Sequence, residues 1–165
     1  MLCRVPAAAD ASSLTRMSTT SPRPANVDAL VRATSIEWED WTSRLDAAGG
    51  RATAVVVGVG TTEAATALIE GALDAFGGFD ILVTNAGVLR DRTFAKMDLD
   101  DFRAVLDVHL MGSVNCTKAV WETMREQNYG RIVMTTSSSG LFGNFGQANY
   151  GAAKMAVVGL MQTLS

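Results

Sequence analysis

The chain has 165 residues, of which 48% are hydrophobic and 19% are charged, and its net charge is −3 at pH 7. This length supports one packed domain rather than two of ordinary size. The lack of a basic excess argues against a nucleic-acid partner, and no apolar run approaches the roughly 20 residues of a membrane helix. One histidine and two distant cysteines, Cys3 and Cys116, predict no metal site and no disulfide framework. They favour a cytoplasmic setting, with peroxisomal or mitochondrial locations left open.

The elements expected in chain order begin with a tail. Residues 1–26 are rich in Ala, Ser, Thr, Pro and Arg without apolar periodicity, which predicts disorder. Broken helical spacing follows from about residue 27 to residue 48 and stops at two glycines. Beyond them, short apolar strands alternate with longer helical segments. We expect strands at 52–59, 79–87 and 131–137, and helices at 61–76, 98–128 and 148–164.

This alternation predicts the fold class. Strands that are apolar throughout and separated by helices are typical of parallel strands covered on both faces. The expected fold is therefore α/β, an incomplete doubly wound parallel sheet of the Rossmann-like kind with helices on both faces. Ligands of such sheets bind at the carboxyl ends of the strands. Glycines and short polar residues gather there, at 57–59, 84–87 and 137–139.

One stretch carries a pattern that core packing does not require. Ser137 precedes Tyr150, and Lys154 follows one turn later on the same face of a predicted helix. A phenol is a poor base at neutral pH because its ordinary pKa lies near 10. A cation about 4 Å away stabilises the phenolate by on the order of 4 kcal/mol at an effective dielectric of 20, which makes the phenol a usable base. The pattern favours proton transfer to a bound oxygen, although a surface Tyr and Lys are the plain alternative.

The order of these motifs resembles the short-chain dehydrogenase/reductase family. The matching elements are "TNAG" at 84–87, the strand that ends at Ser137, and Tyr150-x-x-x-Lys154. "AGVLRDRTF", "VHLMGS" and "GNFGQANYGAAK" resemble one branch, the (3R)-hydroxyacyl-CoA dehydrogenase part of peroxisomal multifunctional enzyme type 2 and its bacterial relatives.

The resemblance implies a role for each matching position. Tyr150 would be the general acid/base, Lys154 would favour its ionised form and bind the nicotinamide ribose, and Ser137 would hold the substrate oxygen. The cofactor would be NAD, with NADP as the alternative. Beside Tyr150 and Lys154, it would meet Asn85, Ala86, Gly87 and the backbone of Val59.

Two positions depart from the usual family pattern. His109 stands where most members carry an asparagine that helps to position a water in a proton relay, so it is a fourth catalytic candidate. Its alternative role is a helix histidine bonded to a neighbouring carbonyl. Gly58 stands where an aspartate usually contacts adenine, so we expect weaker adenine binding.

Parts of the family pattern are missing. No T-G-x-x-x-G-x-G loop occurs in residues 1–48, so residues 27–165 are expected to form a partial domain. This domain would lack the first strand–helix unit and the C-terminal substrate region. Exposed edges and apolar faces then favour self-association, and the resemblance implies a homo-oligomer through the helices 98–127 and 149–165.

Three functions remain open on these grounds. The first is transfer of hydride between NAD(H) and the 3-hydroxy or 3-oxo position of an acyl-CoA. The second is an NADPH-dependent 3-oxoacyl-carrier-protein reductase, whose sequences share "GQANY". The third is an inactive remnant that binds no cofactor, which the absent glycine-rich loop favours.

Overall fold

The computed structural model describes residues 2–4, 28–31 and 38–165. Its sheet has five strands in the order β3-β2-β1-β4-β5. In chain order they are β1 (Leu2–Arg4), β2 (Asp28–Val31), β3 (Arg51–Ala54), β4 (Ile81–Thr84) and β5 (Arg131–Met134). The helices are α1 (Trp38–Ala47), α2 (Thr62–Phe76), η2 (Phe94–Lys96), α3 (Leu99–Leu106), η3 (Asp107–Met111), α4 (Gly112–Glu126), α5 (Ser138–Phe142) and α6 (Ala148–Leu164).

The first part of the chain differs from the sequence-based expectation. Residues 28–31 form a strand and not the start of a helix, and the helix expected near there begins at Trp38. The expected tail mostly lies outside the described residues, but Leu2–Arg4 within it form β1. This strand pairs antiparallel with both β2 and β4, so the sheet is mixed rather than wholly parallel. Such pairings join distant segments and leave no local pattern in the sequence.

From residue 51 onwards the alternation of strands and helices is confirmed. β2 pairs parallel with β3, and β4 pairs parallel with β5. The first expected strand is shorter than predicted and ends at Ala54, and the short α5 was not expected at all. The helix expected at 98–128 comprises α3, η3 and α4, in which η3 is one π-helical turn. Such turns widen a helix locally and are frequent at functional sites.

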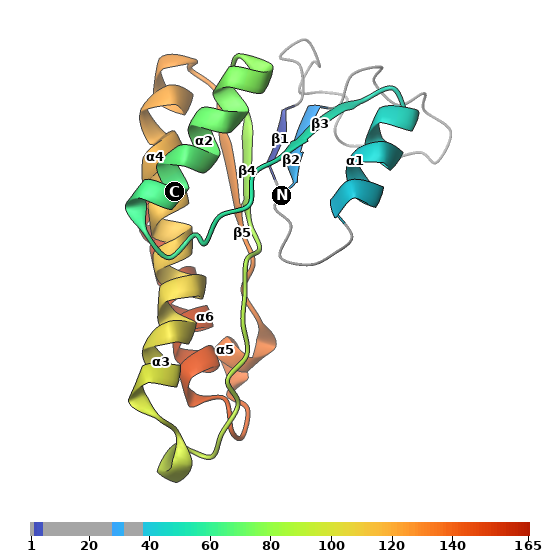
Figure 1. Cartoon of the computed structure of the whole chain (residues 1–165). Coiled ribbons are helices and arrows are strands. Elements are labelled where there is room, and N and C mark those ends of the chain that lie inside the picture. Colours follow the sequence, from blue (N-terminus) through green and yellow to red (C-terminus); the bar gives the residue numbers. More distant parts are fainter. Residues whose placement is uncertain (1, 5–27, 32–37) are drawn as a thin grey trace, which may run out of the picture.

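The helices cover the sheet unevenly. Figure 1 shows α2 and α4 side by side on one side of β4 and β5, while α1 lies next to β3 on the other side. α2 starts at an N-cap, where the Thr61 side chain accepts a hydrogen bond from Ala64 N. The core between these layers is apolar and includes Leu68, Ile69, Leu82 and Val120. Within the described ranges, no helix is long and apolar enough to cross a bilayer.

One side chain, that of Gln127, fixes the end of α4 to the backbone just before β4. The Gln127 amide accepts a hydrogen bond from Phe79 N and donates one to Phe79 O, each at 2.9 Å. Since β4 and β5 run parallel, this anchor sets which residues meet at their carboxyl ends. Thr135 N donates to Thr84 O at 3.1 Å just beyond the paired residues. The segments 85–87 and 135–137 therefore leave the sheet at the same edge.

Candidate active site

Tyr150 and Lys154 lie on α6, one helical turn apart. The Lys154 side chain is only 5% exposed, and its Nζ lies 5.6 Å from the centroid of the Tyr150 ring. Nζ also donates a hydrogen bond to Thr135 O at 2.7 Å, at the end of β5. The two side chains thus share one face of the helix, and that face points to the carboxyl end of the sheet.

Burial changes the electrostatics of the lysine. Removal from water disfavours the charged amine and lowers the pKa of Lys154 below its ordinary value. One of its three N–H donors is used by the Thr135 carbonyl. The other two donors remain available to a ligand that approaches from the Tyr150 side.

The segment that follows β5 runs against α6. Thr136 Oγ1 donates to Lys154 O at 2.8 Å, which fixes the residue before Ser137 against α6. The Ser137 side chain accepts a hydrogen bond from Ser139 N at 3.2 Å and so caps the N-terminus of α5. Ser137 therefore follows two residues, Thr135 and Thr136, that bond to Lys154. Its own side chain is bonded to the first turn of α5.

His109 joins this cluster from the π-helical turn η3. Its ring packs edge-to-face on the Tyr150 ring, with centroids 5.1 Å apart and planes at 88°. Its Nε2 lies 2.8 Å from Val88 O and 3.1 Å from Val88 N. Burial lowers the pKa of His109 below 6.5; the hydrogen bond with Val88 opposes this change, and the charge of Lys154 adds to it.

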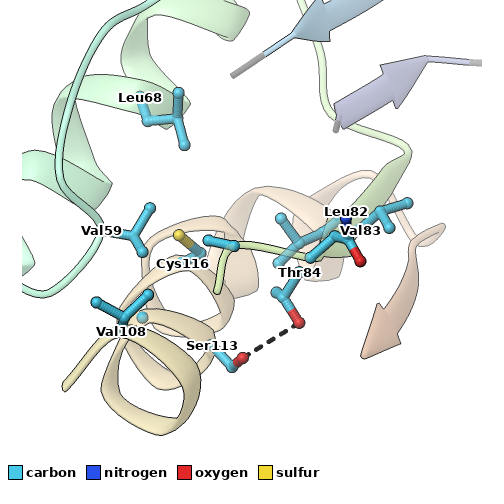
Figure 2. A pocket seen from close by; sticks show the side chains of 11 residues that line it. Val59, Leu68, Leu82, Val83, Thr84, Val108, Ser113 and Cys116 are labelled. Carbon is cyan, nitrogen blue, oxygen red and sulfur yellow. Dashed lines mark hydrogen bonds between the residues drawn. The ribbon is translucent and has the colours of Figure 1, made fainter. Parts of the chain in front are cut away.

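Three of the expected cofactor residues, Val59, Asn85 and Ala86, line a small cavity, whereas Gly87, Tyr150 and Lys154 do not. This cavity has a volume of about 40 Å³ and lies between those three residues and the start of α4. Figure 2 shows the side chains that surround it. Among them, the Ser113 hydroxyl donates a hydrogen bond to the Thr84 hydroxyl at 3.2 Å. The cavity has room for a few water molecules at most. A nucleotide would have to lie along its rim.

Two buried asparagines position the site, and sequence analysis missed both. Asn149 is fully buried and donates to Arg90 O at 2.9 Å, which ties α6 to the segment after β4. Asn115 donates to Val59 O at 3.2 Å, which ties α4 to the segment after β3. The available signal was weak, because an asparagine in a helical pattern usually faces solvent. The one feature of the sequence that could have drawn attention to Asn149 is its position directly before Tyr150.

Large apolar side chains are exposed in α5 and in the loop between α5 and α6. Leu141, Phe142 and Phe145, which follow Ser137 in the chain, are 52%, 85% and 88% exposed. A Cβ added to Gly151 in α6 would lie 3.1 Å from Ser139 O, so the first turn of α5 lies close to the residue that follows Tyr150. In the part of the chain that the structure describes, no cluster of His, Cys, Asp or Glu could hold a metal ion.

The family model described as short chain dehydrogenase matches residues 21–165. The chain belongs to this family. The resemblance expected from "TNAG" and Tyr150-x-x-x-Lys154 is therefore confirmed. The α/β fold class is also confirmed: the solved structure of NAD+-bound xylitol dehydrogenase is similar at a TM-score of 0.78 and 31% identity, over 83% of this chain and 54% of that one.

Relatives of this short-chain dehydrogenase chain include two curated proteins. A short-chain type dehydrogenase/reductase of Mycobacterium tuberculosis is 54% identical over 117 residues, which are 71% of this chain and 41% of the relative. Peroxisomal multifunctional enzyme type 2 of Mus musculus is 50% identical over 117 residues, which are 71% of this chain and 16% of the relative. The chain thus spans less than half the length of either relative.

Proposed function

We propose that the chain contributes the catalytic centre of an NAD(H)-dependent oxidoreductase that interconverts the 3-hydroxy and 3-oxo groups of an acyl-CoA. The observation that carries the proposal is the cluster of Tyr150 and the buried Lys154 on one face of α6. Lys154 donates to Thr135 O, two residues before Ser137. The similarity to peroxisomal multifunctional enzyme type 2 supports the choice of branch.

Each residue has a distinct task in this proposal. In the oxidising direction, the phenolate of Tyr150 accepts the proton of the substrate hydroxyl while the C3–H bond breaks. The positive charge of Lys154 stabilises that phenolate. The Ser137 hydroxyl donates a hydrogen bond to the oxygen that becomes the 3-oxo group. In the reducing direction, Tyr150 returns the proton to the same oxygen.

The cofactor residues present fit part of a dinucleotide. A bound nicotinamide would accept or supply the hydride at C3. The remaining donors of Lys154 suit the hydroxyls of its ribose. Asn85, Ala86 and Gly87 and the Val59 backbone would meet the adenosine end. Because Gly58 offers no carboxylate, contacts to adenine would come from backbone groups alone.

An apolar acyl thioester suits the surroundings of this cluster. The exposed Leu141, Phe142 and Phe145 offer apolar surface within a few residues of Ser137. Burying such side chains against an acyl chain contributes about 25 cal/mol per Å² of area removed from water. A small polar alcohol would leave this surface exposed. The apolar rim therefore favours a substrate that carries an alkyl chain next to its 3-hydroxy group.

Self-association belongs to the same proposal. The helices α3–α4 and α6 expose apolar side chains that include Met111, Met155, Met161 and Leu164, each at least 40% exposed. A second copy that packs on these helices would remove them from water. Sedimentation of the purified chain measures this directly, and a strictly monomeric chain at micromolar concentration contradicts it.

The experiment compares turnover of a (3R)-hydroxyacyl-CoA with NAD and with NADP in the parent chain, in Tyr150→Phe and in Tyr129→Phe. Tyr129 is the other tyrosine of the sequence. It contacts Arg131 and lines a cavity with the last turn of α6 rather than with Tyr150 and Lys154, so it is the matched control. We expect Tyr150→Phe to lower kcat by about 100-fold or more and Tyr129→Phe to leave it unchanged. Equal loss in both variants contradicts the role of Tyr150.

Substrate choice needs a second comparison. The same 3-oxoacyl group is offered to the chain as a CoA thioester and as a carrier-protein thioester. A preference for the carrier protein with NADPH would replace the proposal by the carrier-protein reductase. The third hypothesis, an inactive remnant, predicts no change in NADH fluorescence on titration with the chain. Micromolar binding of NADH contradicts that hypothesis.

A further inference from the structure

His109 occupies a position between the two halves of the candidate site. Its side chain comes from the π-helical turn between α3 and α4 and is 4% exposed. One edge of the ring is held by Val88, directly after the Asn85–Gly87 segment. The other side contacts the ring of Tyr150. Asn149 makes a second link, to the backbone of Tyr150: its side chain donates to Arg90 O and accepts from Tyr150 N. His109 contacts the Tyr150 ring itself.

We propose that His109 is a positioning residue whose uncharged ring fixes Tyr150 against the Asn85–Val88 segment, and that Gly87 is a glycine because this ring occupies the space of its Cβ. The consequence for catalysis rests on the proposed role of Tyr150. The packing itself does not, and it is tested separately.

The steric part of the proposal follows from Gly87. A Cβ added to Gly87 would lie 2.5 Å from His109 Cε1 and 3.3 Å from Nε2. Real Cβ atoms essentially never approach another heavy atom to less than 3.0 Å. The ring cannot retreat without losing its hydrogen bond to Val88 or its contact with Tyr150. Gly87→Ala would therefore push the His109 ring, and the ring would in turn displace Tyr150. This effect is separate from any effect on a cofactor.

The claim that the His109 ring is uncharged follows from its hydrogen bonds. Val88 offers Nε2 an acceptor, its carbonyl oxygen at 2.8 Å, and a donor, its N–H at 3.1 Å. The shorter contact favours a proton on Nε2, because the other tautomer would place that proton on Nδ1, where no acceptor lies in the described part of the chain. Nδ1 is buried and has no hydrogen-bond partner among the described residues. A second proton at Nδ1 would be a buried N–H without an acceptor, next to the ammonium group of Lys154 on α6. The charged groups nearest in sequence, Asp107 on η3 and Arg90 to Arg92 after β4, are exposed.

NMR spectroscopy of the whole chain tests the proposal, because the sequence has one histidine and two tyrosines. With ¹⁵N-labelled histidine, we expect a protonated Nε2 and an unprotonated Nδ1 between pH 6 and pH 8. With labelled tyrosine rings, His109→Ala should shift the signals of Tyr150 and leave those of Tyr129 in place. A protonated Nδ1, or Tyr150 signals that do not move, overturns the proposal.

A double-mutant cycle measured by urea unfolding tests whether the His109 ring excludes a side chain at Gly87. Gly87→Ala should lower the urea midpoint of the chain, and the same substitution in a His109→Ala background should lower it much less. Gly58→Ala is the matched control, since this loop glycine after β3 has no atoms within 4 Å of an added Cβ. Equal losses from Gly87→Ala with and without the histidine overturn the steric claim.

Activity separates this inference from the proposed function. If the enzyme turns over acyl-CoA, His109→Ala should lower kcat by up to about 100-fold, as expected for a misplaced catalytic group. KM for the acyl-CoA should change little, because the ring does not contact the substrate. If the parent chain shows no turnover, the proposed function fails, whereas the NMR signals and the double-mutant cycle still decide the role of His109. Unchanged kcat in an active enzyme overturns the positioning role.

Discussion

Gly140 is the point at which α5 packs on the part of α6 that carries Lys154, and replacing it should disturb stability and, in an active enzyme, turnover. A Cβ on this residue would lie 2.9 Å from Met155 N and 3.0 Å from both the carbonyl carbon and the Cβ of Lys154. Two of these three atoms belong to the backbone of α6, so no flexible side chain can swing away. Gly140→Ala therefore requires α5 and α6 to separate.

The size of the effect follows from these distances. Ordinary contact begins at 3.4 Å, so the two helices must move apart by about 0.5 Å at Met155. Overpacking of this kind costs about 1–3 kcal/mol of unfolding free energy. For a domain of this size, 1 kcal/mol corresponds to about 2–4 °C in the melting temperature. We expect Gly140→Ala to melt about 2–12 °C below the parent chain.

The assay is thermal unfolding followed by circular dichroism, with Gly159→Ala as the matched control. Gly159 also lies within a helix, but nothing approaches within 4 Å of an added Cβ. There the helix propensity of alanine should raise stability by up to about 1 kcal/mol. A Gly140→Ala variant that melts at or above the parent, as Gly159→Ala should, would show that α5 does not pack on α6 as described. In an active enzyme, Gly140→Ala should also lower kcat more than it raises KM.

Three further predictions concern the same framework. Burial lowers the pKa of Lys154 below its ordinary value of 10.5, so the unfolded chain binds more protons than the folded chain just below that pH. The free energy of unfolding should therefore rise with pH in this range; in urea titrations Lys154→Met should remove the rise, and the same change at the exposed Lys118 should not. Gln127→Ala removes both hydrogen bonds to Phe79 and should cost about 1–3 kcal/mol, measured by urea unfolding. Ser137→Ala should lose the cap of α5, about 1 kcal/mol, as well as activity; Ser137→Thr should keep the melting temperature, and equal melting of both variants contradicts the capping role.

Much of the fold from residue 51 onwards could be predicted because its signals are local. The apolar run before Asn85 and the helical spacing from Thr62 to Phe76 each lie within one element, so periodicity identifies them. The cap at Thr61 is a short-range hydrogen bond of the same kind. Antiparallel β1, in contrast, pairs with residues about 26 and 80 positions away, and no spacing rule contains that information.

The candidate site divides in the same way. The spacing of Tyr150 and Lys154 places them on one face of a helix whatever the rest of the chain does, since four residues make about one turn. The sequence alone therefore determined which groups could meet on α6. It did not determine that Lys154 would be buried, or which residues would hold it.

Tertiary structure decided how the separate segments meet. Parallel pairing of β4 with β5 brings Asn85 and Thr135 to one edge, and the π-helical turn places the His109 ring between Val88 and Tyr150. The clash that a side chain at Gly87 would make with that ring exists only in the folded chain. Periodicity along a chain specifies faces of single elements, whereas contact between elements depends on the packing of side chains that are far apart in sequence.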